Sequence, residues 1–343
     1  MPSLSVAKAG NAAFTPSYVP VMVITGATSG IGQAIAQLFA NNQHGRAHIV
    51  LVGRNRAAAE KIIASLPTTS SPAEDTPEQD QLPTTETPKP QPSYEFMSCD
   101  MSLMKNVHDL ARDLSTRLPH INFLVHSAGV FGFGGRQETP EGIDVKLASR
   151  YYARCALTND LLPLLKKAKD ERQPASVLSI LGAGEGPEKI DLGDLGLKKN
   201  YSGAKAMMQS VAYNDLMVAE LAKREPSIAF THMYPGFVDT GMFSFSNPIL
   251  KFIVFLFRPV LRLMLTTPQD CAEYVLHALL DADKGMYRRN SSGDDIGTAK
   301  FPQADGVEKE EAQAIVGAFS RSYDGLVTVQ LIQLSSFFVP YSE

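Results

Sequence analysis

The sequence predicts an α/β fold in which helices cover both faces of a doubly wound, parallel sheet. Short apolar runs, of which 21–24 is the first, alternate along the chain with segments whose apolar residues recur at helical spacing. A glycine-rich turn directly follows the first run, as is typical of a sheet that binds a ligand at its edge. These two observations favour a sheet built from right-handed strand–helix–strand units.

Each element is predicted from its local pattern. Runs that are apolar at every position fit strands covered on both faces. The run at 48–52 is of this kind, and we expect strands at 21–24, 48–52, 94–99, 121–125, 176–180 and 228–233, with 228–233 the last clear strand before the helix at 268–282. An apolar stripe at helical spacing predicts helices at 31–39, 56–66, 107–118, 143–165, 201–224 and 268–282.

One segment interrupts this alternation. Residues 67–92 are rich in Pro, Thr, Ser, Glu and Gln and contain almost no large apolar side chain. Such a segment buries too little apolar surface to offset its ordering entropy, so we predict a disordered insertion. The rest fits a single domain spanning 1–343, with a core at about 21–285 and a C-terminal extension at 286–343.

The composition excludes several classes of function. Of the 343 residues, 44% are apolar and 20% charged, and the formal net charge of −4 gives no reason to expect a nucleic-acid partner. Cys99, Cys155 and Cys271 lack metal-ligand spacing, which suits a reducing compartment and predicts no metal site. No secretory signal is visible, and the apolar stretch at 249–265 is interrupted by charges. We therefore predict a cytoplasmic protein.

The glycine-rich turn predicts a dinucleotide site. Gly26, Gly30 and Gly32 permit a tight passage from strand to helix, where the backbone approaches a pyrophosphate closely. The N-terminus of the following helix then offers N–H groups and the positive end of its dipole. Glycine-rich turns also occur without a ligand, but the position of this one after the first strand favours the cofactor.

The ends of the next strands suggest which dinucleotide binds. The second strand is followed by Arg54 and Asn55 and by no carboxylate, so a 2′-phosphate would meet a cation and NADP(H) is preferred over NAD. Asp100 is placed either to accept a hydrogen bond from the adenine amino group or to cap a short local turn. Ala128 and Gly129 would let the chain pass close to the adenosine ribose.

Tyr201 and Lys205 are candidates for proton transfer. Four residues apart in a predicted helix, they would share one face. An ammonium at about 5 Å would lower the phenol pKa from about 10 by roughly two units, and the lysine would also hold ribose hydroxyls. Ser179, at the end of the 176–180 strand, would hydrogen-bond the substrate oxygen; Ser176 is the rival, with a structural role expected.

Taken together, the chain resembles the short-chain dehydrogenase/reductase family over roughly residues 21–280, which implies a Rossmann-type fold. The resemblance implies that the turn binds the cofactor through Thr25, Gly26, Ser29, Gly30, Ile31 and Gly32. It assigns the chemistry to Ser179, Tyr201 and Lys205. It also implies cofactor contacts at Pro235, Gly236, Val238 and Thr240, the last two beside the nicotinamide carboxamide. Shorter stretches are similar to fungal members that serve natural-product pathways.

Two residues depart from the family pattern. Arg150 stands where the family usually has an asparagine that supports a proton relay, and a guanidinium neither loses a proton nor tolerates Lys205 nearby. It could instead hold an acidic group of the cofactor or substrate. His126 replaces an asparagine after the fourth strand, and we expect it to stitch neighbouring strands.

The segment at 241–266 is rich in Phe, Ile and Leu, and we predict a lid over an apolar ketone or alcohol. A core helix ranks second, and a membrane-surface helix ranks third and is not favoured. Homo-oligomerisation is left open. The sequence thus predicts an NADP-dependent oxidoreductase that interconverts a ketone and a secondary alcohol on a lipophilic small molecule, in secondary-metabolite biosynthesis. A catalytically quiet dinucleotide-binding sensor or scaffold is the alternative, and an epimerase or dehydratase is a third.

Overall fold

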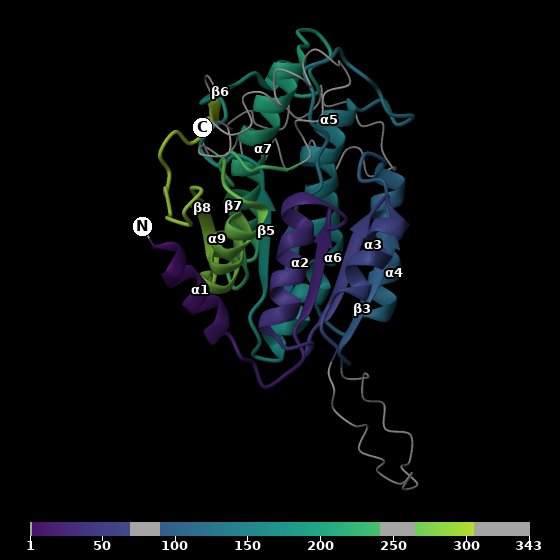
Figure 1. The fold of residues 1–343 in the computed structure, drawn as a ribbon. Helices are drawn as coiled ribbons and strands as arrows, with labels where there is room; N and C mark the ends of the chain where they lie inside the picture. The colour runs from purple at the N-terminus through teal and green to yellow at the C-terminus, as the bar shows by residue number, and fades with distance from the viewer. Residues whose placement is uncertain (1, 69–89, 241–264, 305–343) are drawn as a thin grey trace, which may run out of the picture.

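The computed structural model of the protein describes residues 2–68, 90–240 and 265–304. Within them, seven parallel strands form one sheet in the order β3-β2-β1-β4-β5-β7-β8 (Figure 1). The strands are β1 (Val21–Thr25), β2 (His48–Gly53), β3 (Ser93–Ser98), β4 (Phe123–His126), β5 (Ser176–Ile180), β7 (Ala229–Met233) and β8 (Gly285–Arg289). The predicted doubly wound sheet is confirmed.

Helices cover both faces of this sheet (Figure 1). On one face lie α2 (Gly30–Asn42), α3 (Arg56–Ala64) and α9 (Pro268–Asp281), and on the other lie α4 (Met104–Arg117), α6 (Ala153–Asp170) and α7 (Gly203–Arg224). Side chains of one strand alternate between the two cores: Val21 and Val23 join the core beneath α4, α6 and α7, and Met22 and Ile24 join the core beneath α2, α3 and α9. Burial on both faces explains why β1 and β2 are almost entirely apolar.

The carboxyl ends of the central strands lie side by side. Thr25 pairs with His126, and His126 pairs with Ser179 on the next strand. The order of strands reverses beside β1, because β2 lies on one side of it and β4 on the other. Such a reversal leaves a crevice at the carboxyl edge of the sheet, and ligands of this class of fold bind there.

The sequence patterns did not predict two of the elements. Helix α1 (Leu4–Ala13) packs against α9, so the fold begins before the predicted start near residue 21. Strand β8, which follows α9 along the chain, adds to the sheet beyond β7 and was not predicted. Its Arg288 and Arg289 argue against a buried strand, yet they are only 0% and 6% exposed.

The long helix predicted at 143–165 is divided. It begins as α5 (Val145–Leu147), passes through a π-helical turn (Ala148–Tyr152) and continues as α6. A small second sheet pairs β6 (Lys189–Ile190) with β9 (Gln303–Ala304), and a 3-10 turn covers Leu192–Asp194. No helix in the described part of the chain is long and apolar enough to cross a membrane. Most of the predicted insertion (67–92) and lid (241–266) lies outside the described residues.

Candidate active site

The turn between β1 and α2 has no room for side chains at two of its glycines. A Cβ on Gly32 would lie 2.4 Å from the carbonyl oxygen of Gly26, and one on Gly26 would lie 2.6 Å from the backbone nitrogen of Ala128. Gly26 and Gly30 also have φ angles of 73° and 57°, which glycine adopts without strain. Ser29 precedes α2, but its side chain makes no capping hydrogen bond. The first N–H groups of α2 are thus open to an anion, and the turn fits a dinucleotide pyrophosphate.

The other residues predicted at the ends of β1 and β7 gather around this turn. Thr25 is fully buried at the end of β1, and Ile31 packs against the core behind it. A Cβ on Gly30 would lie 3.2 Å from Cγ2 of Thr240, so the segment after β7 contacts the turn directly. Val238 pairs with Thr266 in an isolated bridge that holds this segment in place.

The segment after β7 turns back at a second glycine. Pro235 accepts a weak hydrogen bond from Cys271 Sγ at 3.7 Å, and Gly236 has a φ angle of 75°. A Cβ on Gly236 would lie 3.1 Å from Cβ of Ser291, which belongs to the loop after β8. The missed strand β8 therefore helps to position the predicted cofactor segment.

The residues after β2 and β3 lie at the same edge of the sheet. Arg54 is exposed, and Asn55 caps α3 by accepting a hydrogen bond from the Ala58 backbone at 3.1 Å. Asp100 Oδ1 accepts bonds from the backbone and the hydroxyl of Ser102, at 2.9 and 2.7 Å. Of the two alternatives for Asp100, the structure contains the local turn.

Tyr201 lies outside the helix in which it was predicted. Helix α7 begins at Gly203, and Ser202 caps it by accepting a hydrogen bond from the Lys205 backbone N–H at 3.1 Å. The phenol oxygen instead accepts a hydrogen bond from Nζ of Lys146 at 2.9 Å. Lys146 is 4% exposed, and its Nζ also reaches the carbonyl oxygens of residues 134 and 135.

The electrostatics of Tyr201 differ from the prediction. Burial raises the phenol pKa, and the carboxylate of Asp144 raises it further, whereas the hydrogen bond from Lys146 lowers it. The net shift is upward, and Lys205 is not among the influences. The expected lowering by Lys205 is thus not observed, because the two residues do not share a helix. Lys146 was missed, although it lies one helical turn before Arg150.

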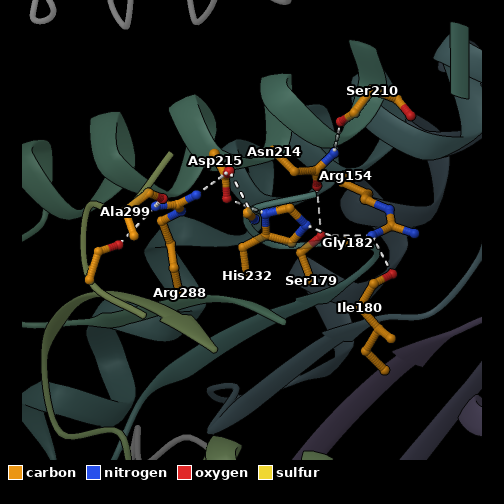
Figure 2. Close-up of polar contacts among 12 residues, drawn as sticks. Arg154, Ser179, Ile180, Gly182, Ser210, Asn214, Asp215, His232, Arg288 and Ala299 are labelled. Atoms are coloured by element: carbon orange, nitrogen blue, oxygen red, sulfur yellow. Dashed lines mark hydrogen bonds and ion pairs between the residues drawn. The ribbon is translucent and has the colours of Figure 1, made fainter. Parts of the chain in front are cut away.

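Ser179 does not reach the cleft. It is 0% exposed and lies on the sheet face beneath α7 (Figure 2). Its hydroxyl donates to Asn214 Oδ1 at 2.7 Å and accepts from Arg154 Nη1 at 2.7 Å. The expectation that it contacts a substrate oxygen is corrected here, because both hydrogen bonds face the interior. The rival Ser176 is also buried, and its hydroxyl bonds the carbonyl of Ala282 at 3.3 Å.

A second buried network holds the loop that follows β5 (Figure 2). Asp215 accepts from Nδ1 of His232 at 2.6 Å and from Nη2 of Arg288 at 2.8 Å, and all three side chains are 0–1% exposed. Nε2 of His232 accepts from the Gly182 backbone at 3.1 Å, so His232 is neutral with its proton on Nδ1. Burial lowers its pKa, consistent with that assignment. The network joins three elements, α7, β7 and β8, to one loop at the crevice.

Arg150 lies in the π-helical turn before α6. Its Nε donates to Ser210 Oγ at 2.9 Å, and its carbonyl accepts from Asn214 Nδ2 at 2.9 Å. A Cβ on Gly129 would lie 3.3 Å from Cγ of Arg150 and 3.9 Å from its Nη1. Turns of this kind are frequent at functional sites. The guanidinium therefore sits directly behind the predicted ribose-binding turn.

The side chain of His126 forms its hydrogen bond with a helix, although its backbone pairs with neighbouring strands. Its Nε2 lies 2.9 Å from Thr158 Oγ1 on α6. Burial lowers the pKa of His126 to about 3, so its imidazole is neutral. The stitching role was correct in kind, but its partner is the helix layer.

Exposed aromatic side chains border the crevice. Phe131 and Phe133 follow β4 and pack edge to face, with ring centroids 5.2 Å apart. They are 43% and 68% exposed, as is Phe237 after β7 at 68%. A Cβ on Gly203 would lie 2.4 Å from the backbone of Phe133, so this pair lies beside the start of α7 and near Tyr201. Phe131 and Phe133 therefore form an exposed apolar pair at this edge of the sheet.

Comparison with known proteins agrees with this geometry. A family model described as a KR domain matches residues 20–141. An oxidoreductase of Emericella nidulans is 32% identical over 265 residues, which cover 76% of this chain and 72% of that protein. A polyprenol dehydrogenase of Mus musculus is 24% identical over 327 residues, covering 91% and 90%.

A solved structure shares the fold. The 3-oxoacyl-(acyl-carrier-protein) reductase of Agrobacterium tumefaciens, solved with NADP bound, has a TM-score of 0.53 and is 18% identical, covering 80% of this chain and 94% of that one. Among the described residues, no group of three or more His, Cys, Asp or Glu could hold a metal ion.

Proposed function

Because the chain belongs to the short-chain dehydrogenase/reductase family of oxidoreductases, we propose that it uses NADP(H) to interconvert a ketone and a secondary alcohol on a lipophilic small molecule. One observation carries the proposal. The turn after β1 has no room for side chains at two of its glycines, and helix α2 follows it without a side-chain cap. This turn lies at the edge of the sheet where the strands end, in contact with Thr240. We extend the proposal to a place in secondary-metabolite biosynthesis, as the resemblance to fungal members implied.

The residues around the turn would hold the dinucleotide. The N-terminus of α2 would bind its pyrophosphate, and Ala128 and Gly129 would lie against the ribose. Arg54 is exposed and, among the described residues, makes no ion pair, so it is available to a 2′-phosphate. Lys205 would donate to ribose hydroxyls. When bound, the nicotinamide supplies or accepts the hydride of the reaction.

Tyr201 would exchange the proton with the substrate oxygen. Its raised pKa keeps the phenol protonated at neutral pH, which suits a general acid in the direction of reduction. The Lys146 ammonium, 2.9 Å from the phenol oxygen, would stabilise the phenolate that remains after the proton leaves. Ser179 would act through Arg154 and Asn214 as a positioning residue.

The substrate would be apolar near its carbonyl. Phe131, Phe133 and Phe237 offer exposed rings at the rim, and an apolar body would remove them from water. The likeness to a polyprenol dehydrogenase, whose name specifies a lipid alcohol, supports the same class of substrate.

The test is NADPH oxidation over a panel of apolar ketones, with Tyr201→Phe as the variant. We expect kcat to fall at least about 100-fold while NADPH affinity stays unchanged, because one general acid is removed. Unchanged turnover by the variant would overturn the assignment of Tyr201.

A quiet dinucleotide-binding protein is the second candidate. The burial of Ser179 favours it, since one of the three expected catalytic groups is withdrawn from the cleft. NADPH binding without turnover of any ketone or alcohol in the panel would support it.

A further inference from the structure

Three cationic side chains lie buried along one helical path. Lys146, Arg150 and Arg154 are 4%, 9% and 2% exposed, and they are spaced four residues apart from α5 through the π-helical turn into α6. A charge in the protein interior needs a partner, because leaving water without one is costly. The hydrogen-bond partners of these three side chains therefore show which of the charges are compensated within the described part of the chain.

Two of the three are well supplied with partners. Lys146 Nζ donates to the phenol of Tyr201 and to the carbonyl oxygens of residues 134 and 135. Arg154 donates through Nη1 to Ser179 and the carbonyl of Ile180. Its Nη2 donates to the carbonyl of Ala128 at 2.7 Å.

Arg150 is the exception. Its Nε is held by Ser210, whose own hydroxyl donates to the Met207 carbonyl at 2.7 Å. Its two Nη groups make no hydrogen bond to any residue that the structure describes. Nη1 lies beside Gly129, at the carboxyl edge of β4. Within residues 2–68, 90–240 and 265–304, the guanidinium is thus anchored through Nε and has no acceptor at either Nη group.

The charge of this region is not balanced by the described part of the chain. No carboxylate there forms an ion pair with Arg150 or Arg154. Burial alone lowers the pKa of Arg150 to about 10, and burial followed by the charge of Arg150 lowers that of Arg154 to about 9. Both guanidiniums keep their charge at neutral pH. The interior beside Gly129 therefore carries two positive charges with only neutral acceptors.

We propose that Arg150 binds an anionic group, a carboxylate or a phosphate, of the small molecule held over Gly129. A planar guanidinium whose two Nη groups bond none of the described residues matches such a group with two parallel hydrogen bonds. The inference rests on the proposed function and narrows it. Either the lipophilic substrate carries an acidic group, or Arg150 binds a phosphate of the cofactor. The asparagine that the family usually has at this position would offer no charge to either group.

The experiment compares Arg150→Met and Arg150→Lys with Arg112→Met, which removes an arginine with a 72% exposed side chain on α4. NADPH affinity is measured by fluorescence titration. The affinities for 6-oxodecanoate and its methyl ester are measured by calorimetry on the NADP⁺-saturated protein. The melting temperature of each ligand-free variant is recorded as well.

We expect Arg150→Met to weaken binding of the anion about 10- to 100-fold, since a charged hydrogen-bonded contact is lost. Arg150→Lys should recover part of it, and Arg112→Met should change nothing. If the acid belongs to the substrate, affinity for the keto acid falls while those for the ester and NADPH hold. If it belongs to the cofactor, NADPH affinity falls. The ligand-free Arg150→Met variant should melt no lower than wild type, because an unbalanced buried charge has gone.

Unchanged affinities for both NADPH and the keto acid would overturn the proposal, as would a lowered melting temperature with unchanged affinities. Failure of the proposed function has a different signature. If no ketone is turned over but Arg150→Met still weakens anion binding, the anion site stands and the catalytic assignment falls. If ketones are reduced and Arg150→Met changes neither anion affinity nor NADPH affinity, the catalytic assignment stands and the anion site falls.

Discussion

Replacing Asp215 with asparagine tests whether the network beneath the active-site loop holds the fold together. The carboxylate accepts from His232 at 2.6 Å, from Arg288 at 2.8 Å and from the Gly184 backbone at 3.3 Å. Asparagine keeps the size of the side chain but has one acceptor oxygen in place of two. At least one buried donor would then face an N–H₂ group, and Arg288 would lose its counter-charge.

The size of the effect follows from this geometry. Breaking a buried ion pair costs about 3–5 kcal/mol because the remaining charge stays buried. Nη1 of Arg288 still donates to the carbonyls of Gly297 and Ala299, at 2.8 and 2.7 Å, so we expect the lower end, about 3 kcal/mol. For a domain whose stability is about 5–15 kcal/mol, that corresponds to a fall in melting temperature of about 6–12 °C.

The assay is thermal unfolding followed by circular dichroism, with Asp113→Asn as the matched control. Asp113 is 49% exposed and pairs with Arg117 at 3.4 Å, so its loss should cost less than about 1 kcal/mol. We also expect kcat/KM to fall in Asp215→Asn, because Gly182 and Gly184 at the crevice lose their anchors. Equal melting temperatures for the two variants would refute the reasoning.

Three further outcomes are expected. Gly32→Ala should abolish measurable NADPH binding while leaving the far-UV circular dichroism spectrum intact, because its methyl group would lie 2.4 Å from a backbone oxygen. Retained NADPH affinity in a titration would contradict the assignment of this turn to the pyrophosphate. Lys146→Met should lower kcat more than Lys205→Met does, since of these two lysines Lys146 donates the hydrogen bond to the phenol of Tyr201. Lys205→Met should act mainly on NADPH affinity. A larger loss of kcat in Lys205→Met would favour the predicted pairing of Tyr201 with Lys205. As pH falls below about 6.5, the free energy of unfolding from urea titrations should fall, with a limiting slope of about 1.4 kcal/mol per pH unit from His126, whose pKa of about 3 keeps it neutral in the folded state while the unfolded chain takes up a proton. The lowered pKa of buried His232 adds to the fall in the same direction. A flat profile between pH about 6.5 and 5 would exclude this linkage.

The strands that the sequence predicted are those whose cause is local. A run that is apolar at every position needs no knowledge of the rest of the chain, and β1 and β5 were placed within a residue of their bounds. Strand β8 has a non-local cause. Its Arg288 is buried because Asp215, far away in sequence on α7, lies above it. A pattern of adjacent arginines predicts exposure unless that partner is known.

The same distinction explains the site. The turn at Gly26, Gly30 and Gly32 was predicted because a few consecutive residues determine a tight passage from strand to helix. The position of Ser179 depends on which sheet face carries α7, and therefore on the alternation of the whole strand and on Arg154 from another helix. A strand-end serine can point to either face, and residue type alone does not decide between them.

The predicted pairing of Tyr201 with Lys205 failed for a reason that the sequence did contain. Two residues four apart share a helix face only when both lie inside the helix. Ser202 is a favoured N-cap residue, and an N-cap receives the backbone N–H three residues later, which here belongs to Lys205. Placing the cap at Ser202 puts Tyr201 outside the helix, so its ring leaves the α7 face and meets the helix that begins at Val145. The cation that reaches the phenol then has to come from that second helix, and Lys146 occupies the place.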